Sequence, residues 1–191
     1  MSALRTVYQA GERLYRRLFR RGLDAHTREI VKVLKSVPAL EHLSKRAALA
    51  MAEAVHRRTY QRGESLYYQG DPGLGLYIVE RGTIRLLTEP EPGLTRELRT
   101  IEAPSMFGVL SILGDFRRME TAETVTETRV LGFFRPDLKN VSRRDPKAGA
   151  DITMALARWV AAQHVDLIEH LAERDGHETA MQAYVEAHTG E

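Results

Sequence analysis

The stretch FGVLSILGDFRRMETAET, residues 107–124, decides how the rest of the chain is interpreted. A Phe-Gly pair begins it, an apolar turn follows at 110–113, and a Gly-Asp turn leads to the pair Arg117 and Arg118. A glycine, a short helical turn and a nearby arginine can together hold one phosphate group. The alternating residues from Thr121 to Thr128 predict a strand directly after this cradle.

Apolar residues recur at every second position through residues 59–134, a range that contains this stretch. Short apolar runs are separated by turns that contain glycine, a pattern typical of a small antiparallel barrel or jelly roll. The segment EPEPG at 89–93 predicts an exposed hairpin tip, because proline cannot donate to strand pairing. We therefore predict an α+β fold with a double-stranded β-helix or jelly-roll barrel of about eight strands.

Helical periodicity is found on both sides of the predicted barrel. It predicts helices over 3–21, 26–35 and 45–58 before the barrel, and over 137–142 and 147–173 after it. Residues 177–191 predict a weak helix or a frayed tail. The long helix 147–173 carries an apolar stripe, interrupted by Gln163, that suits packing on the barrel and on a second copy of itself: Ile152, Leu156, Trp159, Val160, Leu167, Ile168 and Leu171.

These elements divide the chain into three parts. Residues 1–33 form a basic amphipathic helical segment, and residues 34–173 form one domain. Within that domain the barrel covers 59–134 and the C-terminal helices cover 136–173. Residues 174–191 form a tail.

The composition limits the classes of protein to which this chain can belong. The chain has 191 residues, 43% of them hydrophobic and 28% charged, which suits a soluble globular domain. It contains no run of eighteen apolar residues and no apolar leader, so we expect neither a membrane span nor secretion. The absence of cysteine excludes disulfides, thiolate catalysis and cysteine-held metal, and we expect a cytoplasmic protein.

Positive charge is concentrated at the N-terminal end. Residues 1–35 hold nine Lys and Arg against three acidic residues, whereas the rest of the chain is slightly acidic. A helix over 3–21 with an arginine face could contact an acidic membrane surface or a nucleic acid. The same pattern also suits an amphipathic helix that packs on the domain or on a partner.

At this point the residues carry a resemblance. The text LYYQGDPGLGLYIVERG at 66–82, followed by FGVLSILGDFRR at 107–118, resembles the cyclic-nucleotide-binding domain family. That family includes catabolite-activator-type regulators, protein kinase A regulatory subunits and cyclic-nucleotide-gated channels. The resemblance covers about residues 34–173 and implies a phosphate-binding cassette at 107–118, with cyclic AMP or cyclic GMP as the ligand if any is bound.

The resemblance also implies roles for individual residues. Gly108 would face the ribose and phosphate, Arg118 would pair with the cyclic phosphate, and Trp159 would cap the base. Trp159 could equally be a core residue or part of a dimer seam. The predicted ligand-binding set is Phe107, Gly108, Leu110, Ser111, Arg118, Met119 and Trp159.

Three positions depart from the family pattern. Val109 stands where the family has a glutamate that accepts from the ribose 2′-hydroxyl, and Met119 replaces a small hydroxyl residue. Glu120 replaces a small alanine, and on the predicted strand it shares a face with Arg118. We expect Glu120 either to repel a phosphate or to pair with Arg118. Arg117 could take the place of Arg118 if the turn is shifted by one residue.

An enzyme is disfavoured by the motifs. The seven histidines show no metal-ligand spacing, and the chain has no nucleophile elbow, P-loop or GxGxxG. Asp115 with Glu120 or Glu123 could suggest paired catalytic carboxylates, but interleaved arginines favour a solvated surface. We expect no metal and no catalytic residue.

Two functions remain open. The first is a ligand-responsive regulatory module that signals through helix 147–173 to a partner. The second is a scaffold or adaptor that has lost nucleotide binding and acts by dimerisation and by docking on a protein or an acidic membrane. About 18 residues follow 173, so we expect no DNA-binding domain; we expect a homodimer through 147–173 and a protein partner that the sequence does not identify.

Overall fold

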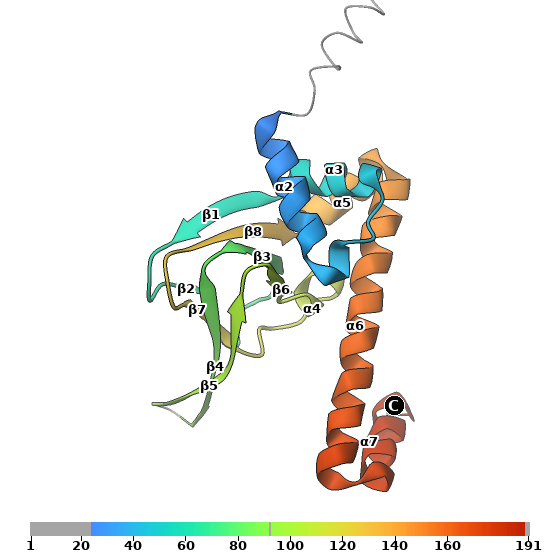
Figure 1. Cartoon of the computed structure of the whole chain (residues 1–191). Coiled ribbons are helices and arrows are strands. Elements are labelled where there is room, and N and C mark those ends of the chain that lie inside the picture. The colour runs from blue at the N-terminus through green and yellow to red at the C-terminus, as the bar shows by residue number, and fades with distance from the viewer. Residues whose placement is uncertain (1–23, 92, 190–191) are drawn as a thin grey trace, which may run out of the picture.

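The structure, a computed structural model, describes residues 24–91 and 93–189. Within them, eight strands form two four-stranded antiparallel sheets, in the orders β1-β8-β3-β6 and β2-β7-β4-β5. Figure 1 shows these strands gathered on one side of the molecule, with helices on the other. The strands are β1 (His56–Tyr60), β2 (Ser65–Tyr67), β3 (Gly75–Arg81), β4 (Thr83–Glu91), β5 (Leu94–Glu102), β6 (Ser105–Phe107), β7 (Thr121–Thr124) and β8 (Thr128–Phe134).

The helices lie before, within and after the strands. A four-residue helix, α4, is inserted between β6 and β7, at the apolar turn noted in the sequence. The described helices are α2 (Ala25–Ser36), the 3-10 turn η1 (Pro38–Leu40), α3 (Lys45–Ala54), α4 (Leu110–Leu113), α5 (Arg135–Arg144), α6 (Pro146–Asp175) and α7 (His177–Thr189).

The predicted jelly-roll fold with eight strands and flanking helices is confirmed, with one qualification. The two sheets are not closed into a continuous barrel, because each ends in strands that pair on one side alone. The predicted hairpin tip at 89–93 overlaps the end of β4, whose last residue, Glu91, pairs with Leu94 of β5. Pro90 falls within β4, and the pairing shifts register between Thr88 and Glu91 around it.

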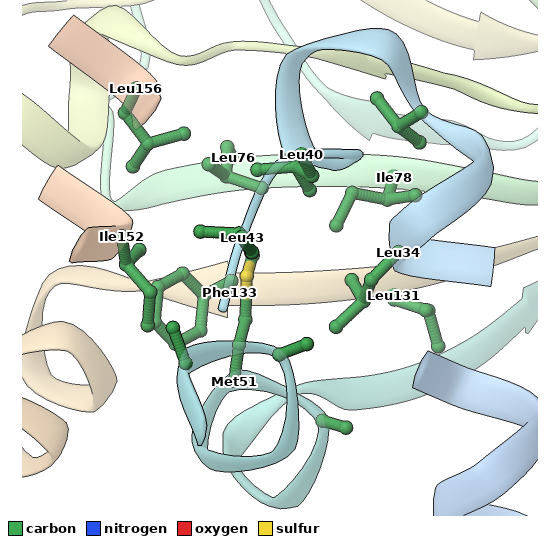
Figure 2. Packing of buried hydrophobic residues seen from close by; sticks show 14 of the residues in the cluster. Leu34, Leu40, Leu43, Met51, Leu76, Ile78, Leu131, Phe133, Ile152 and Leu156 are labelled. Carbon is green, nitrogen blue, oxygen red and sulfur yellow. The ribbon is translucent and has the colours of Figure 1, made fainter. Parts of the chain in front are cut away.

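Two apolar clusters hold the domain together. The larger one lies between the helices and the sheet β1-β8-β3-β6, and Figure 2 shows Leu34, Met51, Phe133 and Ile152 converging in it. The smaller one lies between the two sheets and includes Val79. The run 76–79 in β3 is buried because alternate side chains serve the two clusters: Leu76 and Ile78 face the helices, and Val79 faces the opposite sheet.

Several predicted element bounds were wrong. The helix predicted over 45–58 ends at Ala54, and its last residues instead begin β1. Ser44 caps α3, since its side chain accepts from the Ala47 N–H. The strand predicted from Thr121 to Thr128 is broken after Thr124, and β8 begins only at Thr128.

The C-terminal part of the chain is a helical hairpin. Helix α6 begins at its cap Asp145, whose side chain accepts from the Ala148 N–H at 3.1 Å, and it ends before Gly176. Figure 1 shows α7 folding back along the distal half of α6. Ala180 of α7 is 2% exposed, so residues 177–189 form a packed helix rather than a frayed tail.

Nothing among the described helices has the length and apolar character that crossing a bilayer requires. The predicted basic helix over 3–21 lies outside the described residues.

Candidate functional site

A cleft of about 400 Å³ opens between the sheets and α6. Its size suits a small ligand. It has three walls: the stretch around α4, the β4–β5 hairpin, and the middle of α6. All seven residues that the sequence predicted as ligand-binding line it: Phe107, Gly108, Leu110, Ser111, Arg118, Met119 and Trp159.

Arg118 occupies the inner end of the cleft and is 6% exposed. Its Nη2 donates to the Gly75 carbonyl at 2.8 Å and its Nη1 to the Gly108 carbonyl at 3.3 Å. The guanidinium carbon lies 4.0 Å from the centroid of the Tyr67 ring and 5.6 Å from that of Tyr77. The charge of Arg118 is therefore held by aromatic faces and backbone carbonyls, in place of a carboxylate.

Glu120 does not pair with Arg118, contrary to one of the two predicted outcomes. Its carboxylate Oε1 accepts from the Tyr67 hydroxyl at 2.7 Å. Arg118 and Glu120 both precede β7, so the predicted strand that would place them on one face is absent. Burial, and then the nearby Glu120 carboxylate, raise the pKa of the Tyr67 phenol.

The other two residues that depart from the family pattern differ in burial. Val109 is 2% exposed and belongs to the core beside the helices, so it contributes apolar wall where a sugar-binding carboxylate is implied by the family pattern. Met119 is 70% exposed at the mouth of the cleft. The two side chains make the cleft more apolar at its inner wall and at its opening.

Two glycines shape the cradle. Gly108 has φ +71°, and a side chain there would collide with the Arg118 guanidinium. Gly73 is buried, and a side chain there would collide with the Ser111 hydroxyl and the Phe116 carbonyl. Both positions therefore need glycine for the loops to approach each other and for Arg118 to take its place.

Trp159 extends from α6 into the cleft and also packs against the core beside the helices. It is half-buried, so it packs as a core residue, one of the roles considered for it, and also lines the cleft. Sequence reasoning missed several lining residues. From α6 these are Val160, Gln163, His164 and Leu167, and from the hairpin Leu86, Arg99 and Ile101.

A simple pattern could have found the hairpin residues. On β5, Ile101 is buried and Arg99 lies two residues before it, so the strand period places both on one face. The α6 residues could not be found in this way, because nothing in a helical stripe reveals which part of a helix stands over a pocket.

Among the described residues, the carboxylates and histidines considered as catalytic or metal-binding groups do not come together in one site. Asp115 pairs with Arg135, Glu123 with Arg85, and Glu120 bonds to Tyr67, so the carboxylates are held by three different partners. Within residues 24–91 and 93–189, no three His, Asp or Glu side chains are grouped as metal ligands would be.

Comparison with known proteins shows which family and which structures this chain is similar to. The family model described as "Cyclic nucleotide-binding domain" matches residues 57–145. The chain is 33% identical over 111 residues to the cyclic AMP receptor protein of Thermus thermophilus, covering 58% of this chain and 51% of that protein. It is 31% identical over 113 residues to a CRP-like cAMP-activated global transcriptional regulator of Mycobacterium tuberculosis, covering 59% and 50%.

Solved structures agree with this match. The catabolite activator protein of Thermus thermophilus superposes with a TM-score of 0.55 at 31% identity, over 68% of this chain and 61% of that one. A cyclic nucleotide-binding domain from Methylobacillus flagellatus reaches a TM-score of 0.66, over 79% and 85%; at 16% identity it shows the shared fold alone. The chain spans about half the length of the curated relatives it matches.

Proposed function

We propose that this chain is a non-enzymatic, cytoplasmic regulatory module that responds to a cyclic mononucleotide, and the similarity of residues 57–145 to the cyclic nucleotide-binding domain model supports this. One observation carries the proposal. The glycine, the small turn, Arg118 and Trp159 meet in a single cleft, although they come from two loops and a helix. Such a cleft can hold a phosphate at one end and a base beneath α6.

The proposed binding mode starts at the inner end of the cleft. The phosphate would bind at Gly108 and Ser111, where the Arg118 guanidinium supplies the charge. To reach it, Arg118 gives up one or both of its bonds to the Gly75 and Gly108 carbonyls. Because the guanidinium is already desolvated against Tyr67, exchanging the neutral carbonyl acceptors for a charged phosphate costs little further desolvation of the guanidinium.

The proposed signal passes through α6. Its proximal residues Ile152 and Leu156 are fully buried, whereas most residues beyond Val160 are exposed. A base bound under Trp159 would add contacts to this distal half and shift the helix toward a closed position. A partner protein, or a second copy bound through 147–173, would detect that shift.

Calorimetric titration of the full chain with cyclic AMP and cyclic GMP tests the proposal. We expect binding by the wild type and at least about a tenfold loss of affinity in Arg118→Lys, which keeps the cation but lacks the bidentate fork. Arg62→Ala removes an exposed arginine outside the cleft and should bind normally. Absence of heat and of thermal stabilisation at millimolar ligand contradicts the proposal.

A second candidate is a scaffold that no longer binds nucleotide. Two observations favour it: Arg118 is satisfied without a ligand, and the Glu120 carboxylate stands in the cleft. A scaffold of this kind would act by dimerisation and by docking of residues 3–21 on a protein or an acidic membrane. It predicts co-sedimentation of the full chain with anionic vesicles, weakened by added salt, in the absence of any effect of cyclic nucleotides on melting.

A further inference from the structure

Three arginines of the described ranges line the cleft, and one of them, Arg99, comes from the β4–β5 hairpin rather than from the stretch around α4. Arg99 of β5 pairs across the hairpin with Leu86 of β4, and it lies two residues before the buried Ile101. All three residues line the cleft. Cross-strand partners and alternate residues share one face of a sheet, so the position of Arg99 over the cleft is fixed by the hairpin register.

Arg99 differs from the other two arginines that line the cleft, Arg117 and Arg118, because its side chain has no partner in the part of the chain that the structure describes. Within residues 24–91 and 93–189, no hydrogen bond, ion pair or ring contact engages its guanidinium. By contrast, Arg85 of the adjacent strand pairs with Glu123, and Arg117 donates to the Gly70 carbonyl at 2.7 Å. Arg118 is bonded to two carbonyls. Among the described residues of the cleft, Arg99 is therefore the arginine whose whole guanidinium is available to a ligand.

The surroundings of Arg99 suit a flat aromatic base. Leu86 and Ile101 form an apolar floor beside it, and Trp159 and Leu167 stand on the opposite wall. A ligand whose phosphate lies at Arg118 would place its base between these walls, with its polar edge toward the Arg99 side chain. An arginine fork matches the adjacent O6 and N7 acceptors of guanine, whereas adenine presents an amino donor at position 6.

We propose that Arg99 reads the base and selects a 6-oxopurine, so that the module binds cyclic GMP in preference to cyclic AMP. This inference rests on the proposed function, because it assigns the base end of the same cleft. Glu120 and the cradle around Gly108 take no part in the choice, since both lie at the phosphate end. The apolar residues Leu86 and Ile101 give no preference between purines.

Three nucleotides distinguish the contribution of the purine O6 from that of the 2-amino group. Cyclic GMP and cyclic IMP both carry O6 and N7, and cyclic IMP has hydrogen where cyclic GMP has its 2-amino group. We expect the wild type to bind both about tenfold or more tightly than cyclic AMP, as judged by calorimetry on the full chain. In Arg99→Ala the three affinities should converge, with the affinity for cyclic AMP unchanged within about twofold.

The matched control is Arg96→Ala. Arg96 is an exposed arginine on the same strand, pairs with Thr88 and does not line the cleft, so its loss should leave the preference intact. A wild type that binds cyclic AMP as tightly as cyclic IMP, or an Arg99→Ala variant that keeps the preference, overturns this inference and leaves the proposed function standing. Failure of all three nucleotides to bind the wild type overturns both.

Discussion

The central carbon of the Arg118 guanidinium lies over the Tyr67 ring, 4.0 Å from the ring centroid. The Tyr67 hydroxyl in turn donates to Glu120, so a cation, an aromatic ring and a carboxylate are joined in sequence across the inner end of the cleft. Tyr67 separates the two opposite charges, which explains why Arg118 and Glu120 do not form the ion pair that their spacing suggests. This arrangement leads to the first two predictions.

Glu120→Gln should strengthen cyclic nucleotide binding. The amide oxygen can still accept from Tyr67, while the negative charge near the phosphate end is removed. We expect the dissociation constant of the nucleotide to fall about fivefold, because one negative charge is removed from a partly solvated position. The measurement is calorimetric titration at low and high salt, and the gain should shrink as salt rises. Glu127→Gln, an exposed change outside the cleft, should have no effect; a gain there would mean that overall charge is responsible.

Tyr67→Phe should alter the dependence of stability on pH. The pKa of Tyr67 is raised in the folded protein by burial and by Glu120, so its contribution to stability is complete below the unfolded value of about 10. Above that pH the unfolded chain releases the Tyr67 proton while the folded chain retains it, and stability falls. Urea unfolding at pH 8 and pH 10.5 should therefore show a smaller loss in Tyr67→Phe than in the wild type. Equal losses of stability in the variant and the wild type would contradict the raised pKa of Tyr67.

Gly73→Ala should damage the cleft through packing alone. Gly73 is buried, and a methyl group would collide with Ser111 and the Phe116 carbonyl, so the loop carrying Arg118 must shift. We expect a loss of about 1–3 kcal/mol in stability, together with weakened nucleotide binding. Gly63→Ala is the comparison, because Gly63 has φ +82° in open space and lies outside the cleft. It should lose some stability with an unchanged dissociation constant.

Val165→Glu should weaken self-association if α6 forms the proposed homodimer. Val165 and Met154 are each 53% exposed and lie three turns apart on one face of α6. A buried, unpaired carboxylate at that seam should weaken the dimer at least about tenfold. Light scattering across a concentration series measures this, with Ala187→Glu on the exposed side of α7 as the control. A monomeric wild type, or a dimer unaffected by Val165→Glu, contradicts the proposal.

The fold was largely predictable because its determinants are local. The change from a helical to a strand period near 59, and back again after 134, marks the sheets, and turn glycines such as Gly70 and Gly82 mark where strands end. The open edges of the two sheets could not be predicted, because closure depends on pairing between strands distant in the chain. The same applies to the packing of α7 on α6.

The seven predicted ligand-binding residues were found by position in a motif, and the structure brings all of them to one cleft. The hairpin and α6 residues of the cleft were missed, since they lie on segments far apart in the chain, from Leu86 to Leu167, and carry no shared pattern.

The sequence by itself determined the alternation of helix and strand, the need for glycine at the tight corners, and the presence of a Gly108-to-Arg118 cassette. These follow from backbone sterics and from side-chain periodicity, which act over a few residues. The tertiary structure alone decided which groups Arg118 contacts, that Tyr67 stands between it and Glu120, and that Arg99 faces the cleft without a partner. Those relationships depend on burial and charge contacts between segments that meet only when the sheets and α6 have packed.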